Sequence, residues 1–237
     1  MFKGKVILVV DDESDLREIL RDELIFEGAQ VFEAANGREA LELLSKRKFD
    51  AVLSDIRMPG GDGATLARAI RQKNASTPVL MLITGFADLH CEEALAMGAD
   101  GYVTKPFHLE ELKSNLQWLL MPSEQRWKAG ERAQSAQRSM EISQSLTELV
   151  KAGRLRLGRG GFFLQTDPGQ ARYGEVMDIL FPRGQVVRVR VRWVRSDAQE
   201  NQERGLGLEF LQVSDAIQAE IHKLVPNLQN EKAYIPN

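Results

Sequence analysis

The stretch AVLSDIRMPGGDG, at residues 51–63, constrains the fold more than any other part of the sequence. Its apolar run, residues 51–53, ends at Ser54 and Asp55, and the turn-forming residues 58–61 follow at once. Such a run is typical of a buried strand that stops at a carboxylate and then turns. In open α/β sheets, ligands bind just outside the carboxyl ends of the strands. We therefore expect Asp55 to lie in a binding site.

Three further apolar runs stop at polar residues in the same way. They are residues 6–10 before Asp11 and Asp12, residues 79–83 before Thr84, and residues 101–104 before Lys105. Crowded carboxylates repel one another, and a hard divalent cation with oxygen ligands relieves that repulsion. A lysine and a hydroxyl suit an incoming phosphoryl group. The sequence therefore predicts metal-assisted transfer of a phosphoryl group onto a carboxylate nucleophile.

The segments VDDE, LSDIRMPG, LITG and YVTKPF, in this order, carry a family resemblance. Residues 3–120 resemble the receiver domain of bacterial two-component response regulators. Ordinary turn formation explains one aspartate or threonine at a strand end, but not five matching positions in this order. The resemblance implies a partner that donates the phosphoryl group, either a sensor histidine kinase or a phosphotransfer protein.

The resemblance also implies a role for each matching residue. Asp55 would accept the phosphoryl group, and Asp11, Asp12, Asp55 and the backbone carbonyl of Arg57 would hold Mg²⁺. Thr84 and Lys105 would contact the phosphoryl group, and Thr84 and Tyr102 would form the switch. The Lys105–Pro106 peptide bond is commonly cis in receivers, and X–Pro bonds have a small trans preference.

Strand and helix patterns alternate along residues 5–120. Helical apolar spacing occurs at residues 16–24, 40–44, 66–70, 89–97 and 109–120. Alternation of this kind predicts a parallel sheet covered on both faces. We therefore expect an α/β domain at residues 1–120, a five-stranded parallel, doubly wound receiver.

Residues 121–152 change in composition and lack proline after Pro122. Ile142, Leu146 and Leu149 lie at helical spacing, which predicts a helical connector that is well formed after about residue 133. The apolar spacing does not persist over three heptads, so a coiled coil is not indicated. This stripe nevertheless raises the hypothesis of a homodimer that forms on phosphorylation.

Residues 153–213 contain short apolar runs separated by turn residues 167–169 and 182–184 and by the polar stretch 196–204. This spacing predicts a small antiparallel β-barrel. A helical pattern at residues 215–225 and a polar tail follow. The predicted domain covers residues 153–237.

The runs RGGFFLQT, VRVRWVR and GLGLEF, with the terminal helix, resemble a PilZ domain over residues 153–225. PilZ domains are best known as receptors for cyclic di-GMP. They typically carry Arg-x-x-x-Arg and then Asp/Asn-x-Ser-x-x-Gly, whereas this chain has Arg156 and Gly158 at the acidic and serine positions and keeps only Gly161. We therefore expect a degenerate PilZ-like output that acts through an unidentified protein partner. The alternative is a cyclic di-GMP receptor.

Arginines supply the candidate ligand residues of that alternative. They are Arg154, Arg156, Arg159, Arg188 and Arg192. Strict alternation along residues 186–195 would place Arg188, Arg190 and Arg192 on one face. The other face would carry Val187, Val189, Val191 and Trp193. That arginine face is either a solvated surface or a patch for an anion or a partner. No helix-turn-helix pattern is apparent, so DNA binding is not expected.

Charge, cysteine content and hydropathy indicate the domain organisation and the location of the protein. Residues 1–121 carry 14 Lys and Arg against 20 Asp and Glu, a net charge of −6, whereas residues 122–237 carry 17 against 14, a net charge of +3. Different surface charge is common between separate domains. The single cysteine, Cys91, excludes an internal disulfide, and no apolar run reaches the length of a membrane span. We expect a cytoplasmic protein that is not an enzyme, apart from a receiver's catalysis of its own phosphoryl transfer and hydrolysis.

Overall fold

The computed structural model describes residues 1–59, 62–73, 78–85, 98–122, 125, 127, 135–196, 203–226 and 235. The chain forms two compact units, Met1–Leu120 and Met121–Asn237. The helix predicted at residues 89–97 lies outside the described residues, as do most residues of 123–134. Within the described part of the chain, no helix is long and apolar enough to cross a membrane.

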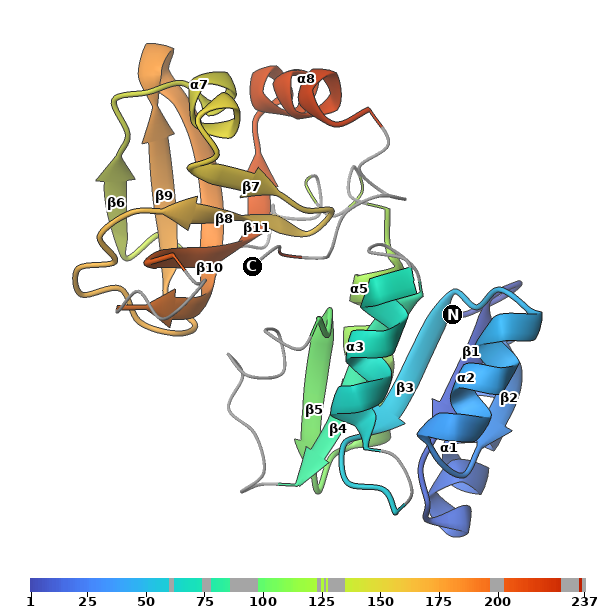
Figure 1. The fold of residues 1–237 in the computed structure, drawn as a ribbon. Helices are drawn as coiled ribbons and strands as arrows, with labels where there is room; N and C mark the ends of the chain where they lie inside the picture. The colour runs from blue at the N-terminus through green and yellow to red at the C-terminus, as the bar shows by residue number, and fades with distance from the viewer. Residues whose placement is uncertain are drawn as a thin grey trace. The chain divides into compact units, whose positions relative to one another are not determined.

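The N-terminal unit contains one parallel sheet with helices packed against it (Figure 1). Its strands are β1 (Val6–Val10), β2 (Gln30–Ala34), β3 (Ala51–Asp55), β4 (Val79–Gly85) and β5 (Gly101–Lys105). Its described helices are α1 (Ser14–Phe26), α2 (Gly37–Lys46), α3 (Gly63–Lys73) and α5 (Leu109–Leu120). The strand order is β2-β1-β3-β4-β5, and every pairing is parallel. The predicted five-stranded parallel α/β sheet is confirmed.

Apolar strands explain why this sheet is covered on both faces. Leu8 and Val10 of β1 belong to a core cluster that includes Ala40 of α2 and Leu66 of α3. Their neighbours along β1 point to the opposite face, since side chains alternate along a strand, and they are also fully buried. A sheet buried on both faces needs near-continuous apolar strands, which is the pattern that the sequence showed.

The C-terminal unit contains a six-stranded sheet of order β6-β9-β10-β11-β8-β7. Its strands are β6 (Arg138–Glu141), β7 (Leu155–Leu157), β8 (Gly161–Gln165), β9 (Val176–Phe181), β10 (Gln185–Arg195) and β11 (Gly205–Val213). Helices α7 (Leu146–Lys151) and α8 (Asp215–Leu224) and the short 3-10 helix η2 (Pro182–Gly184) complete it. All pairings are antiparallel except β6 with β9. The sheet is therefore mixed, and closure into a barrel stays a prediction.

The predicted helical connector is wrong at residues 138–141, which form strand β6. Arg138–Glu141 pairs in parallel with β9, and Met140 packs against the core of the C-terminal unit. Pairing with β9 satisfies the backbone of this segment, and that tertiary contact outweighs a weak local helix preference. Leu146 and Leu149 of α7 are 1% and 2% exposed in the same core. The predicted self-association stripe is therefore buried and does not form a free surface.

The predicted side-chain alternation along β10 is wrong at its C-terminal end. Val191 pairs with Leu208 and lies in the core, but the register shifts after it, so Trp193 pairs with Gly207. A β-bulge of this kind inserts one residue and moves the following side chain to the other face. A Cβ atom on Gly207 would lie 2.1 Å from the Trp193 ring, so glycine leaves the space that the indole fills.

Candidate functional site

Three carboxylates gather at the carboxyl edge of the parallel sheet. Asp11 and Asp12 follow β1, and Asp55 is the last residue of β3. Each residue contributes one carboxylate oxygen as a potential metal ligand, and these three oxygens lie within 4.8 Å of one another. Asp11 is fully buried and Asp55 is 6% exposed, whereas Asp12 faces solvent. The structure therefore brings the predicted acidic residues together at a site that opens on one side.

Lys105, at the end of β5, reaches the same carboxylates. Its Nζ atom lies 3.3 Å from Asp11 Oδ2 and 3.4 Å from Asp55 Oδ1. It also lies 3.1 Å from Oε1 of Glu13, a contact that the sequence analysis missed. The acidic run Asp11-Asp12-Glu13 was the available signal. Burial alone would lower the pKa of Lys105, but the three carboxylates, Glu13 first, raise it to about 12. Lys105 is therefore a fixed positive charge in this site.

Thr84 and Tyr102 lie on the neighbouring strands β4 and β5, and Tyr102 pairs with Leu82, two residues before Thr84. Thr84 is fully buried on β4, one residue beyond Ile83, which pairs with Asp55. Its hydroxyl donates a hydrogen bond to the carbonyl of Gly85 at 3.0 Å. Tyr102 is half-buried on β5 and packs against the core cluster near α2 and α3. Thr84 therefore lies next to the site and Tyr102 lies against the core, while the role of both residues as a switch stays a prediction.

The backbone around Asp55 is held closely. The N–H of Arg57 donates to Asp55 Oδ2 at 3.2 Å, and the N–H of Ile56 donates to Ile83 at 3.0 Å. A Cβ atom on Gly63 would lie 2.2 Å from the Asp55 carbonyl oxygen, so the start of α3 requires glycine there. The Lys105–Pro106 bond is cis, as the resemblance implied. The predicted metal contact from the Arg57 carbonyl stays a prediction.

Burial raises the pKa of Asp55 above its ordinary value of 3.8; Lys105 lowers it, and the negative charge of Asp11 raises it further. A carboxyl group whose pKa is higher in the folded state than in the unfolded state stabilises the folded state at low pH. This stabilisation is lost as the pH rises from the unfolded-state pKa through the folded-state pKa. At neutral pH the ionised Asp55 therefore reduces stability.

We accordingly expect Asp55→Asn to stabilise the N-terminal unit of the full chain. In EDTA at pH 7, its free energy of unfolding should increase by on the order of 1 kcal/mol. Urea denaturation followed by far-UV circular dichroism measures this. The gain should shrink as the pH falls, because the wild-type carboxylate of Asp55 then protonates. A variant less stable than the wild type at pH 7 would contradict the expectation.

The donor set fits a hard divalent cation. Mg²⁺ prefers oxygen ligands and is commonly held by one or two carboxylates with water and phosphate oxygens. Asp11, Asp12 and Asp55 supply carboxylate oxygens at one point, and their mutual repulsion favours a bound cation. The acidic pocket is therefore consistent with Mg²⁺ binding.

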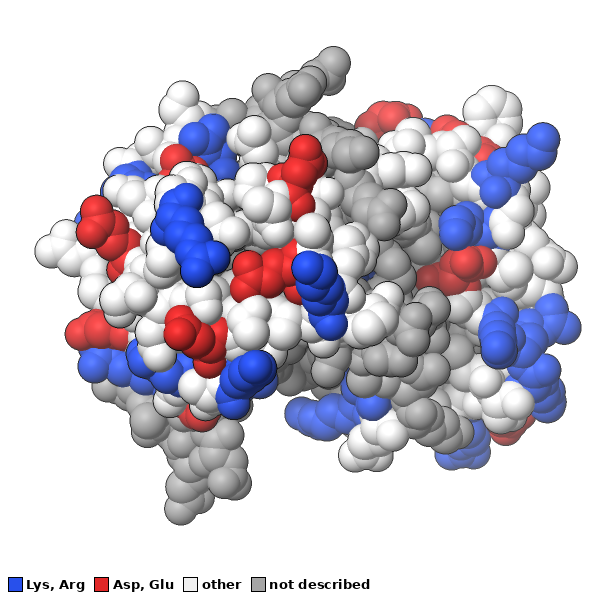
Figure 2. Space-filling model, turned by 90° about the horizontal axis from the view of Figure 1, so that it is seen from above, with Lys and Arg blue, Asp and Glu red and all other residues white. Residues whose placement is uncertain are grey.

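The candidate ligand arginines of the C-terminal unit contact groups of the protein itself. Arg188 makes a bidentate pair with Asp178, at 2.8 and 3.0 Å, and Arg192 Nε lies 2.9 Å from a carboxylate oxygen of Glu209. Arg154 donates to the side chain of Gln144, Arg156 pairs with Glu203, and Arg159 is 4% exposed. On the face shown in Figure 2, basic and acidic side chains of the described residues are interspersed. Arg154, Arg156, Arg188 and Arg192 therefore each have a partner within the protein, and the predicted ligand site stays a prediction.

Comparison with known proteins identifies the family to which the N-terminal unit is similar. Residues 7–117 match the model of the response regulator receiver domain. The response regulator MprA of Mycolicibacterium vanbaalenii is 36% identical over 148 residues, which are 62% of this chain and 64% of that protein. MprA of Mycobacterium sp. (strain KMS) is 41% identical over 114 residues, 48% of this chain and 50% of that protein. The chain thus spans between half and two thirds of these relatives.

Solved structures are similar to about half of the chain. The response regulator TrrA of Thermotoga maritima, solved in complex with Mg²⁺-BeF, is 40% identical and covers 48% of this chain and 98% of its own, with a TM-score of 0.42. The geometry of the acidic site and the family match concern the same residues. Residues 7–117 of this chain form a response regulator receiver domain.

Proposed function

We propose that the chain is a phosphorylation-switched response regulator of a two-component system, with Asp55 as the phosphoryl acceptor. The observation that carries this proposal is the cluster of Asp11, Asp12 and Asp55 within 4.8 Å, with Lys105 3.4 Å from Asp55. The donor would be a sensor histidine kinase or a phosphotransfer protein, which is consistent with a cytoplasmic location. The receiver would occupy residues 1–120.

In the proposed reaction, a carboxylate oxygen of Asp55 attacks the phosphorus atom of the donor. The bond from phosphorus to the leaving atom breaks, its electron pair stays with the donor, and an acyl phosphate forms on Asp55. Mg²⁺ held by Asp11, Asp12, Asp55 and the Arg57 carbonyl would neutralise charge on the phosphoryl oxygens. The Lys105 ammonium supplies a second positive charge at those oxygens, and Thr84 supplies a hydroxyl donor.

The same residues provide a switch. The Thr84 hydroxyl, which donates to Gly85 in this structure, would turn to a phosphoryl oxygen once Asp55 is modified. Tyr102 would then move inward from its half-buried position, and the surface that includes β5 and α5 would change. Because α5 ends at Leu120, directly before the C-terminal unit, it is the covalent route to that unit.

We also propose that the C-terminal unit is a degenerate PilZ-like output that acts through protein contacts. Its three characteristic runs fall on β8, β10 and β11, and α8 follows them. The alternative of a cyclic di-GMP receptor needs arginines that are available to a dianionic ligand. Contacts of Arg188 with Asp178 and of Arg192 with Glu209 disfavour it, since a ligand would have to displace those carboxylates.

The test of the proposed function is a magnesium-dependent phosphoryl adduct. The full chain is incubated with acetyl phosphate in Mg²⁺ or in EDTA, and intact-protein mass spectrometry measures the adduct. We expect one phosphoryl group in Mg²⁺ and none in EDTA, because the carboxylate cluster needs a cation before it can accept an anionic phosphoryl group. An adduct of equal yield in EDTA, or no adduct in Mg²⁺, would reject the proposed function.

A further inference from the structure

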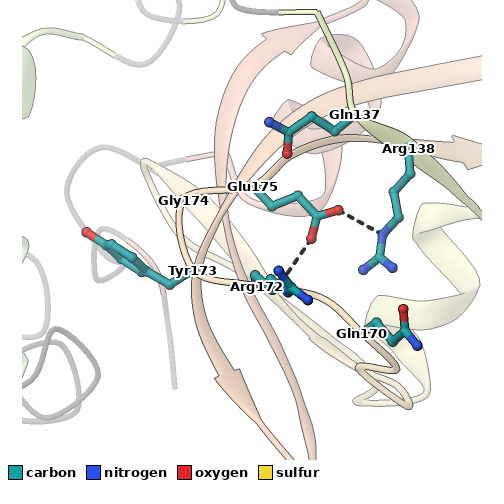
Figure 3. Close-up of a pocket in the computed structure, with 7 residues that line it drawn as sticks. All are labelled: Gln137, Arg138, Gln170, Arg172, Tyr173, Gly174 and Glu175. Carbon is teal, nitrogen blue, oxygen red and sulfur yellow. Dashed lines mark hydrogen bonds and ion pairs between the residues drawn. The ribbon is translucent and has the colours of Figure 1, made fainter.

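A polar hollow lies in the C-terminal unit where β6 begins and the loop between β8 and β9 ends. Its volume is about 540 Å³. The residues that line it are Gln137 and Arg138, at the start of β6, and Gln170, Arg172, Tyr173, Gly174 and Glu175 of the loop. Figure 3 shows the guanidinium groups of Arg138 and Arg172 and the amide of Gln170 facing the same space. The ring of Tyr173, by contrast, points away from them at the rim. The hollow therefore presents several donors to one point.

Glu175 is the carboxylate of this hollow, and its two oxygens already have partners. Arg138 Nε lies 3.1 Å from Oε1, and the backbone N–H of Arg172 donates to Oε2 at 3.0 Å. Its side chain is 14% exposed. One guanidinium and one backbone donor thus satisfy Glu175, which leaves the lining with two guanidinium groups and one carboxylate.

The remaining donors lack acceptors. The Nη2 atom of Arg138 is buried and has no hydrogen-bond partner within the described ranges. Within the same ranges, the structure gives the guanidinium group of Arg172 no ion pair and no hydrogen bond. A buried donor without an acceptor is unfavourable, so an acceptor that enters the hollow gains a hydrogen bond without breaking one.

The backbone holds these groups in place. Arg138 pairs with Met177 across β6 and β9, and Gln137 N–H donates to Val176 at 2.8 Å. Gly174, with a φ of 80°, supplies the left-handed turn, and its N–H donates to Val191 at 2.8 Å. Both walls of the hollow are therefore tied to the central strands of the sheet, which reduces the ordering that binding would require.

We propose that this hollow binds the phosphate group of a small organic phosphate monoester. Guanidinium groups bind phosphate oxygens in a bidentate manner, and two of them with one carboxylate leave a net positive charge. The amide of Gln170, which faces the same space as the two guanidinium groups, can donate to a further oxygen. A hollow of this volume is in the usual range for small-molecule sites, and it has room for the organic part beside the phosphate.

This site is separate from the acidic cluster of the N-terminal unit and from the arginines weighed for cyclic di-GMP. It uses Arg138 and Arg172, neither of which belongs to those sets, and it does not depend on phosphorylation of Asp55. It would give the C-terminal unit a small-molecule input of its own.

Calorimetric titration of the full chain, in EDTA and at physiological salt, tests the proposal. The probes are inorganic phosphate and glycerol 3-phosphate. We expect a saturable one-site isotherm for both and tighter binding of glycerol 3-phosphate, because the hollow accommodates its glycerol group. Arg138→Gln and Arg172→Gln should each weaken binding about tenfold or more. Lys151→Gln, which removes an exposed positive charge of α7 outside the hollow, is the control and should leave binding unchanged.

Glu175→Gln separates a binding role from a merely structural one. The amide can still accept from the Arg172 N–H, but one negative charge is gone, so binding should tighten, whereas general disruption of the loop would weaken it. Isotherms that do not saturate, or that Arg138→Gln and Arg172→Gln leave unchanged, would overturn the site. Tighter binding of inorganic phosphate than of glycerol 3-phosphate would overturn the assignment to a monoester.

Discussion

Replacement of Asp55 by asparagine is expected to abolish the magnesium-dependent phosphoryl adduct of the full chain, with a loss of about 100-fold or more. Asparagine keeps the size of the side chain, but its neutral amide cannot attack phosphorus to form an acyl phosphate. Asp55 is the cluster carboxylate that ends β3, and Arg57 N–H and Lys105 fix its two oxygens. Intact-protein mass spectrometry after incubation with acetyl phosphate measures the loss.

Two matched variants sharpen this prediction. Asp22→Asn removes an exposed carboxylate of α1 and should leave the adduct unchanged. Asp12→Ala removes one of the three oxygen donors but keeps the nucleophile, so Mg²⁺ affinity should fall roughly tenfold or more, while excess Mg²⁺ restores the adduct. An adduct that persists in Asp55→Asn would place the acceptor elsewhere and reject the assignment.

Replacement of Trp127 by alanine is expected to destabilise the C-terminal unit by about 3–5 kcal/mol. Trp127 is 2% exposed and belongs to the core of that unit. Its ring centroid lies 5.6 Å from that of Phe210 on β11 and 5.6 Å from that of His222 on α8. Truncation would leave a large cavity between the sheet and α8, and the loss of aromatic contacts adds to that cost.

Hydrogen exchange followed by mass spectrometry locates the effect of Trp127→Ala. Peptides from β11 and α8 should lose protection, whereas peptides from β1 and β3 should keep it. Trp127→Phe preserves much of the apolar volume and should cost less. Phe26→Ala, which removes an aromatic ring that is 85% exposed on α1, should change stability by no more than about 0.5 kcal/mol. Unchanged protection of β11 and α8 in Trp127→Ala would show that the indole does not support this core.

The receiver could be predicted because its signals are local. Each apolar run indicates a strand, and helical spacing between the runs indicates the helices. The polar residues that end the runs lie at the same edge of a parallel sheet. The positions of Asp11, Asp55, Thr84 and Lys105 follow from that rule alone. The contact between Lys105 and Glu13 does not follow, because it depends on how far two side chains extend across the finished edge.

The C-terminal unit shows what the sequence by itself could not determine. Its turns and most of its short strands could be recognised in the sequence. Residues 138–141 carry no local strand signal, and they form β6 only because they pair with β9, more than 30 residues later. Likewise, strict alternation predicts one face for Trp193, and the register shift against β11 gives it the other. Outside β6, the sequence indicated which segments form strands and which residues end the strands of the receiver. Pairing between distant strands decided register, faces and the grouping of charged side chains, because those depend on partners that no local pattern identifies.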